Sequence, residues 1–371
     1  MGSQISRRGF IAAAAGIAAL AGTACATNGG GSVSGSGSAS GLGADSSARV
    51  FDTFDLHCDT IDILGMAKHK PYSEFDNKCV GTLSSNNAQV SADRMGPARW
   101  VQCYAIWIPN TAGEDATDVK PIDWYREAAL WFKKQMEECA DRFTQVRDFS
   151  EISAILDEGK VPAILTVENA SCLEEGVGIV DEFAKDGVLM ASLTFDGKNA
   201  LGCGVDNADE GLTDLGRQCI AALEDHGITL DVSHLNDKSF WELDALAAKP
   251  YIASHSNARA VCKNSRNLTD DMFNAIMQRG GIVGLNFSDG YVQDGGNNYD
   301  FEQLAKHIHH WLDLGGEDVI ALGSDRDGSW PPHWIADVSS QESLYQRFVD
   351  EFSVSTAHKL FFENAMNFFG A

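Results

Sequence analysis

The sequence Val50-Phe51-Asp52-Thr53-Phe54-Asp55-Leu56-His57-Cys58-Asp59 is a strand-like run that ends in a histidine and a carboxylate. Side chains at positions i and i+2 lie on the same face of a strand, so His57 and Asp59 can reach one ion. A histidine or a carboxylate also follows each of four later strand-like runs. They are Glu168 after VPAILTV, His234 after ITLDVS, His255 after YIAS and Asp325 after VIALGS. Residues placed at successive strand ends predict a convergent site at one end of a sheet.

Eight apolar or β-branched runs are expected to form strands, and segments of helical periodicity follow them. The expected strands are residues 50–56, 100–108, 161–167, 188–194, 228–233, 251–254, 281–286 and 319–324. Helices are expected over 124–143, 212–226, 240–248 and 268–279. This alternation predicts an α/β fold, a (β/α)₈ TIM-like barrel with its chemistry at the carboxyl ends of the strands. An open doubly wound sheet is the alternative, but it would normally place its ligand at one switch point, whereas candidate residues here follow five strands.

Composition excludes one class of partner. The chain has 371 residues, of which 44% are hydrophobic, so it can bury one large core. Its formal net charge is −25, and no basic cluster could follow a phosphate backbone. Nucleic acid is therefore not an expected partner.

Residues 1–26 are expected to be a signal peptide of the twin-arginine type. Arg7 and Arg8 precede an apolar run over 11–21, which is shorter than the roughly 20 residues that a membrane span needs. Gly22-Thr23-Ala24-Cys25 resembles a lipoprotein box with Cys25 as the lipidated residue, and ordinary cleavage after Ala26 is the alternative. The Gly/Ser-rich linker over 27–47 favours lipidation, because an anchored domain needs a flexible tether. We expect an exported bacterial protein at the cell surface or periplasmic face, bound to the membrane only through this anchor, with its catalytic domain over 48–371.

Two blocks of sequence carry a resemblance to a known family: Ser254-His255-Ser256-Asn257-Ala258-Arg259 and Arg266-Asn267-Leu268-Thr269-Asp270-Asp271. These blocks resemble those of the membrane (renal-type) dipeptidases, a zinc-dependent family of amidohydrolase-like barrels, and the resemblance runs over about residues 51–328. It implies two Zn²⁺ ions per chain, with Glu168 bridging them. It also implies an acid/base role for Asp325, a clamp on the substrate's C-terminal carboxylate at Arg266, and a further substrate contact at Tyr291. The implied ligands are His57 and Asp59 for one ion and His234 and His255 for the other.

The sequence departs from the family pattern after the fourth expected strand. Many animal members carry a histidine in the motif Leu-Thr-His, which is thought to stabilise the developing oxyanion, whereas this chain reads Leu193-Thr194-Phe195. The oxyanion partner therefore does not carry over to this chain. Asn199, which we expect on the substrate side, or the metal ions alone are the alternatives.

The resemblance and the ligand chemistry together predict an exported binuclear zinc dipeptidase that hydrolyses dipeptides with a metal-bridging hydroxide. A homodimer is also compatible with the family. One alternative is a barrel metallohydrolase acting on another amide, a lactone or an ester, and the expected carboxylate clamp at Arg266 argues against it. The other is a non-catalytic peptide-binding lipoprotein, and the presence of every expected acid and metal ligand argues against that.

Overall fold

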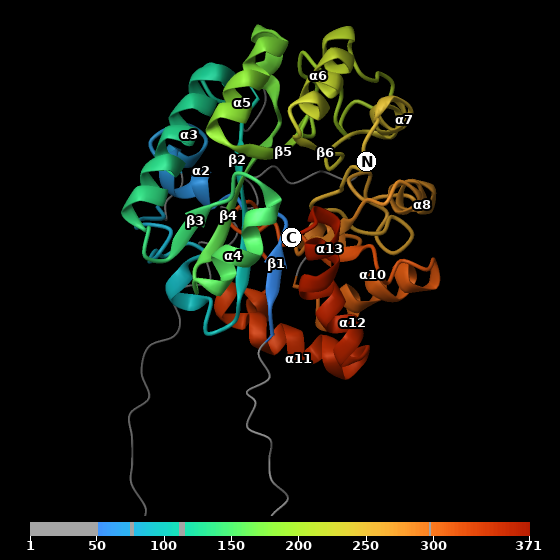
Figure 1. Cartoon of the computed structure of the whole chain (residues 1–371). Helices are drawn as coiled ribbons and strands as arrows, with labels where there is room; N and C mark the ends of the chain where they lie inside the picture. The colour runs from blue at the N-terminus through green and yellow to red at the C-terminus, as the bar shows by residue number, and fades with distance from the viewer. Residues whose placement is uncertain (1–50, 75–77, 111–115, 297) are drawn as a thin grey trace, which may run out of the picture.

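The computed structural model describes residues 51–74, 78–110, 116–296 and 298–371 (Figure 1). The expected signal peptide over 1–26 with Cys25, the linker over 27–47 and Val50 of the first expected strand lie outside the described residues. Within the described ranges, none of the helices combines the length and the apolar character required to span a bilayer.

Parallel strands form a closed barrel at the centre of the molecule. They are β1 (Thr53–Asp55), β2 (Trp100–Trp107), β4 (Val161–Glu168), β5 (Val188–Ser192), β6 (Thr229–Asp231), β7 (Val283–Leu285) and β8 (Ile320–Leu322). Their order is β6-β5-β4-β2-β1-β8-β7, and every pair is parallel. Residues 251–254 close the barrel, because Ile252 bridges to Asp231 of β6 and Ala253 bridges to Val283 of β7. The predicted (β/α)₈ barrel is confirmed.

The structure corrects two of the expected elements. Residues 251–254 make isolated bridges rather than a strand, because the backbone N–H of Ser254 donates to the Asp231 carboxylate (2.9 Å) instead of to a neighbouring strand. The helix expected over 124–143 is α3 (Pro121–Glu138), and an additional strand, β3 (Phe143–Gln145), follows it and pairs with the start of β4. Phe143 continues the apolar spacing of α3, so periodicity alone could not separate the two elements.

Helices lie around the outside of the barrel (Figure 1). Several begin at a side-chain cap: Thr213, Asn236, Thr269 and Asp300 each accept a hydrogen bond from a backbone N–H in the first turn. The helices besides α3 are α2 (Thr60–Gly65), α4 (Ile152–Asp157), α5 (Val180–Asp186), α6 (Asp214–Asp225), α7 (Asp237–Leu246), α8 (Asp270–Gln278), α9 (Asp289–Val292), α10 (Phe301–Asp313), α11 (Gln341–Glu351), α12 (Val354–His358) and α13 (Asn364–Phe369).

The amino-terminal end of the barrel is closed by the C-terminal segment. Phe369 of α13 stacks on Phe54 of β1 with ring centroids 5.5 Å apart. Phe362 lies against the guanidinium of Arg99, the residue before β2. Both phenylalanines belong to the apolar cluster that fills the barrel interior. Only the carboxyl ends of the strands are left for a site that a substrate could enter.

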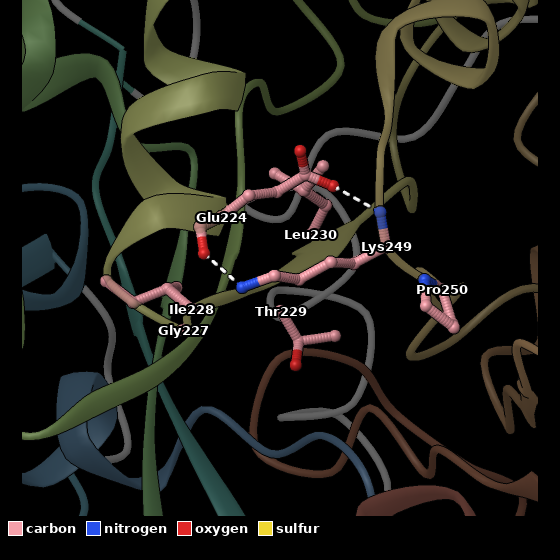
Figure 2. A pocket seen from close by; sticks show the side chains of 7 residues that line it. All are labelled: Glu224, Gly227, Ile228, Thr229, Leu230, Lys249 and Pro250. Carbon is pink, nitrogen blue, oxygen red and sulfur yellow. Dashed lines mark hydrogen bonds between the residues drawn. The ribbon is translucent and has the colours of Figure 1, made fainter.

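A small pocket lies at the amino end of β6, where hydrogen bonds connect α6 with residues 248–249 (Figure 2). The Glu224 carboxylate accepts hydrogen bonds from the backbone N–H groups of Ala248 (2.9 Å) and Lys249 (2.8 Å). The Lys249 ammonium in turn donates to the backbone carbonyl of Glu224. These bonds fix the end of α6 to the chain that enters residues 251–254. The pocket lies at the opposite end of β6 from His234, at the face where barrels carry stability rather than chemistry.

Candidate metal centre

The residues expected at the strand ends converge at the carboxyl-terminal side of the barrel. His57 Nε2 lies 3.5 Å from Asp59 Oδ2 and 3.7 Å from Glu168 Oε2. On the other side of Glu168, its Oε1 lies 2.7 Å from His234 Nε2 and 3.7 Å from His255 Nε2. The Nε2 atoms of His234 and His255 are 2.9 Å apart. These five side chains are at most 5% exposed, so they form one buried polar cluster.

Two groups of ligand atoms share Glu168. His57, Asp59 and Glu168 form one group, and Glu168, His234 and His255 form the other; within each, the ligand atoms lie within 4.8 Å of one another. Asp325 joins His57 and His255 in a third group of the same size. Each of these sets of imidazole and carboxylate atoms could hold a metal ion, and Glu168 belongs to two of them.

The backbone turns sharply where these side chains enter the site. His234 and Asp325 adopt left-handed conformations, with φ of 73° and 57°, and Asn169 directly after Glu168 has φ of 60°. Such conformations are uncommon outside glycine and concentrate at functional sites. His234 and Asp325 both contribute atoms to the candidate ligand groups.

Asp59 does not cap the helix that follows it. Asp59 precedes α2, but its side chain makes no capping hydrogen bond to that helix. Its Oδ2 atom faces His57 instead. The buried His57 Nε2 makes no hydrogen bond to any described residue. This nitrogen faces Asp59 and Glu168 at 3.5 and 3.7 Å, a spacing that a bound cation between imidazole and carboxylates would satisfy, so the donor set fits a divalent metal of the borderline class.

The surroundings of His57 and His255 shift the pKa values of the two histidines in opposite directions. Burial by itself would lower the pKa of His57, but Asp59, Glu168 and Asp325 raise that pKa to about 9. Burial and the neighbouring positive charge of His57 and Arg266 place the pKa of His255 well below its ordinary value. His255 is therefore a neutral imidazole, the form that can ligate a metal.

Asp325 lies beside the ligand groups at the end of β8. Its Oδ2 atom accepts a hydrogen bond from Asn286 Nδ2 at 3.1 Å, which fixes the carboxylate. Gly328 follows on the same turn, and a Cβ there would overlap Asp59 Oδ2 and lie 2.8 Å from Asp325 Oδ1. Glycine at 328 therefore leaves the space that both carboxylates occupy.

Arg266 is buried beside the cluster with part of its guanidinium uncommitted. Its Nη1 donates to Ser256 Oγ (2.8 Å), and its Nε lies 3.1 Å from His234 Nδ1. The buried Nη2 atom makes no hydrogen bond to any described residue. The guanidinium carbon lies 5.7 Å from the centroid of the Tyr291 ring, in α9. The two residues expected on the substrate side, Arg266 and Tyr291, thus stand together.

Asn199 lies in the loop after β5, and its carboxamide is used within that loop. Its Nδ2 donates to Asn169 Oδ1 and to the Leu193 carbonyl, both at 2.8 Å. Its Oδ1 accepts from the backbone N–H groups of Leu201 (2.7 Å) and Gly202 (3.1 Å). Its role towards a substrate stays a prediction, and such a role would require these bonds to rearrange.

Phe195, in the loop after β5, is part of an aromatic wall. Its ring centroid lies 5.4 Å from that of Trp107 and 4.5 Å from that of His234. The side of His234 that this wall covers is therefore apolar.

The structure also reveals hydrogen-bond partners behind the histidines that the sequence analysis did not identify. Asp196 Oδ1 lies 2.7 Å from His234 Nδ1. His255 Nδ1 lies 2.6 Å from Ser254 Oγ, and that hydroxyl donates to Asp231. One signal was present for Asp231, since a carboxylate inside an apolar strand must be paired with a donor. Asp196 lies in a loop and carries no comparable signal.

Comparison with known proteins agrees with this geometry. A family model described as membrane dipeptidase (peptidase family M19) matches residues 47–371. A Klebsiella pneumoniae protein, described as an uncharacterized protein in the pqqA 5′ region, is 31% identical over 236 residues, 60% of this chain and 86% of the relative. A crystal structure of a metallo peptidase from Rhodobacter sphaeroides, liganded with a phosphinate mimic of the dipeptide L-Ala-D-Ala, superposes with a TM-score of 0.75 at 25% identity, over 86% of this chain and 99% of that one.

A second solved structure shows the same fold. The metallo peptidase dipeptidase AC superposes with a TM-score of 0.73 at 24% identity, over 86% of this chain and 98% of that one. The family match covers nearly the whole described chain, and the buried ligand cluster lies where a barrel enzyme carries its chemistry. The chain belongs to the membrane dipeptidase family, peptidase family M19, and is a metallo-dipeptidase-type hydrolase.

Proposed function

We propose that this protein is an exported, lipid-anchored dipeptidase that holds two zinc ions and hydrolyses the peptide bond of free dipeptides. The observation that carries the proposal is the pair of ligand groups sharing Glu168, placed beside a buried arginine with an uncommitted N–H group. The dipeptide mimic bound by the Rhodobacter sphaeroides relative supports the substrate class. Export and lipidation at Cys25 rest on the sequence of residues 1–47 alone.

Each residue of the metal centre has a chemical task in this proposal. His57 and Asp59 would hold one ion, His234 and His255 the other, and Glu168 both. Bound ions would polarise the scissile carbonyl and make a water molecule more acidic.

Asp325 stands next to both ligand groups, and Asn286 fixes its Oδ2. It can accept the proton of the attacking water and return it to the leaving amine. Arg266 Nη2 would donate to the substrate's C-terminal carboxylate, a charge-assisted bond that orients the dipeptide.

Removal and return of metal test the proposal directly. The metal-free protein is expected to be inactive on a dipeptide, and activity should return as about two equivalents of zinc per chain are added. Titration with zinc, followed by both dipeptide hydrolysis and metal analysis, gives the measurement. Full activity at one equivalent would contradict the binuclear assignment.

Arg266→Ala should separate a dipeptidase from a hydrolase of other amides or esters. Loss of a charge-assisted hydrogen bond worth about 1.5–3 kcal/mol should lower kcat/KM for a free dipeptide roughly ten- to hundredfold. The same substitution should hardly change the rate on the C-terminally amidated dipeptide, which presents no carboxylate. Arg126→Ala is the control, because Arg126 pairs with Glu182 at the surface and should leave both rates unchanged. An equal loss on the acid and the amide would contradict the clamp.

A further inference from the structure

We propose that Asp196 is a positioning residue that holds His234 in the tautomer able to bind metal and keeps it from pairing with Arg266. This inference rests on the proposed function, since it concerns a ligand of the second ion and the carboxylate clamp. The inference links the metal ligand His234 to the carboxylate clamp at Arg266 through one atom, His234 Nδ1.

Two groups of opposite hydrogen-bonding character compete for His234 Nδ1. Asp196 Oδ1, at 2.7 Å, can only accept a hydrogen bond when the carboxylate is ionised. Arg266 Nε, at 3.1 Å, can only donate one. In the neutral ring, Nδ1 either carries the proton and donates it, or offers its lone pair and accepts. It therefore cannot satisfy both neighbours at once.

The choice at Nδ1 determines what Nε2 can do. If Nδ1–H donates to Asp196, the Nε2 lone pair points towards Glu168 Oε1 and His255, where a metal would lie. If Nδ1 accepts from Arg266, the proton sits on Nε2, and the ring cannot ligate a metal. A carboxylate behind a ligating histidine fixes the first tautomer. Asp196 is therefore the group that makes His234 a ligand.

The same choice controls the guanidinium. With Nδ1–H given to Asp196, Arg266 Nε loses its acceptor on His234 and keeps only its bond to Ser256 through Nη1. More of the guanidinium is then available for a substrate carboxylate. Metal binding at His234 and carboxylate binding at Arg266 should accordingly strengthen each other.

His255 provides an internal comparison because its second nitrogen has no such competitor. His255 Nδ1 bonds to Ser254 Oγ, which donates to Asp231, and no arginine contacts this relay among the hydrogen bonds of the described residues. Loss of Ser254 should weaken metal binding, and loss of Arg266 should not restore it, because Arg266 donates no hydrogen bond to His255 Nδ1. The competition is thus specific to His234.

Zinc affinity of the full chain, measured against a competing chelator, tests the inference. Asp196→Ala should weaken zinc binding at one of the two positions about 10- to 100-fold, the range for losing such a carboxylate. In the double variant Asp196→Ala/Arg266→Ala, zinc affinity should recover most of that loss, because no donor remains to hold the wrong tautomer. Asp196→Asn keeps an acceptor oxygen and should lose less. Asp209→Ala, an exposed acid nearby, controls for the change in charge and should bind zinc like the unmodified protein.

The ¹⁵N shifts of His234 in the metal-free protein give a readout independent of activity. They should report Nδ1–H in the unmodified protein and Nε2–H in Asp196→Ala. Additive losses in the Asp196/Arg266 cycle, or an unchanged tautomer, would overturn the inference while leaving the proposed dipeptidase intact. Failure of the unmodified protein to bind zinc would instead overturn both proposals. Ser254→Ala combined with Arg266→Ala should show no recovery.

Discussion

Asp325→Asn is expected to lower kcat for a dipeptide about 10²- to 10⁴-fold and to leave two zinc ions bound. Asparagine has nearly the same shape, and its Oδ1 can keep the hydrogen bond from Asn286. It cannot accept the proton of the attacking water, however, and the chain would lose its proton carrier. Steady-state kinetics together with metal analysis of the same sample give the measurement.

The ligand atoms of Asp325, His57 and His255 lie within 4.8 Å of one another, so the geometry also allows Asp325 to be a metal ligand. If the variant loses metal in proportion to activity, Asp325 is a ligand and not the acid/base residue. Asp209→Asn, an exposed substitution of the same kind, should leave both kcat and metal content unchanged.

Glu168→Gln is expected to abolish activity and to reduce zinc from two ions to below about one per chain. Glu168 contributes one carboxylate oxygen on each side, 3.7 Å from His57 Nε2 and 2.7 Å from His234 Nε2. An amide is neutral and offers only one oxygen, so both positions should weaken together. Metal analysis after dialysis against a weak chelator gives the measurement.

Single-histidine variants make the result specific. His57→Ala and His234→Ala each touch only one of the two groups that share Glu168, and each should retain about one ion. Glu174→Gln, at an exposed position in the short helix after β4, is the matched control and should keep two. If Glu168→Gln also keeps one ion, Glu168 serves a single metal and the shared-ligand assignment is wrong.

The convergence of the site could be predicted from the sequence because parallel strands bring their carboxyl ends to one face. His57, Glu168, His234, His255 and Asp325 all follow barrel strands or the closing segment, and the structure brings them together. The prediction needed only the place of each residue at the end of a strand, which is local information, and the parallel direction of the strands. Their roles as ligands and acid/base remain predictions.

The groups behind the ligands could not be predicted in the same way. Asp196 reaches His234 from a loop whose path depends on the packing of Phe195 against Trp107 and of Asn199 against Asn169. None of these contacts is visible as a periodic pattern. The sequence also could not show that residues 251–254 form bridges instead of a strand. The backbone N–H of Ser254 donates to the Asp231 side chain, whereas in a strand it would donate to a neighbouring strand.

When no metal is bound, the carboxylates around His57 favour a proton on its ring. With its pKa raised to about 9, His57 is charged at neutral pH, among three buried carboxylates that would otherwise repel one another. A metal ion that binds His57 must displace this proton, so metal binding at His57 releases a proton. The stabilisation from the charged ring is fully present below its ordinary pKa of 6.5 and is lost as the pH rises through about 9. The metal-free fold is therefore expected to lose this contribution to its stability in alkaline solution.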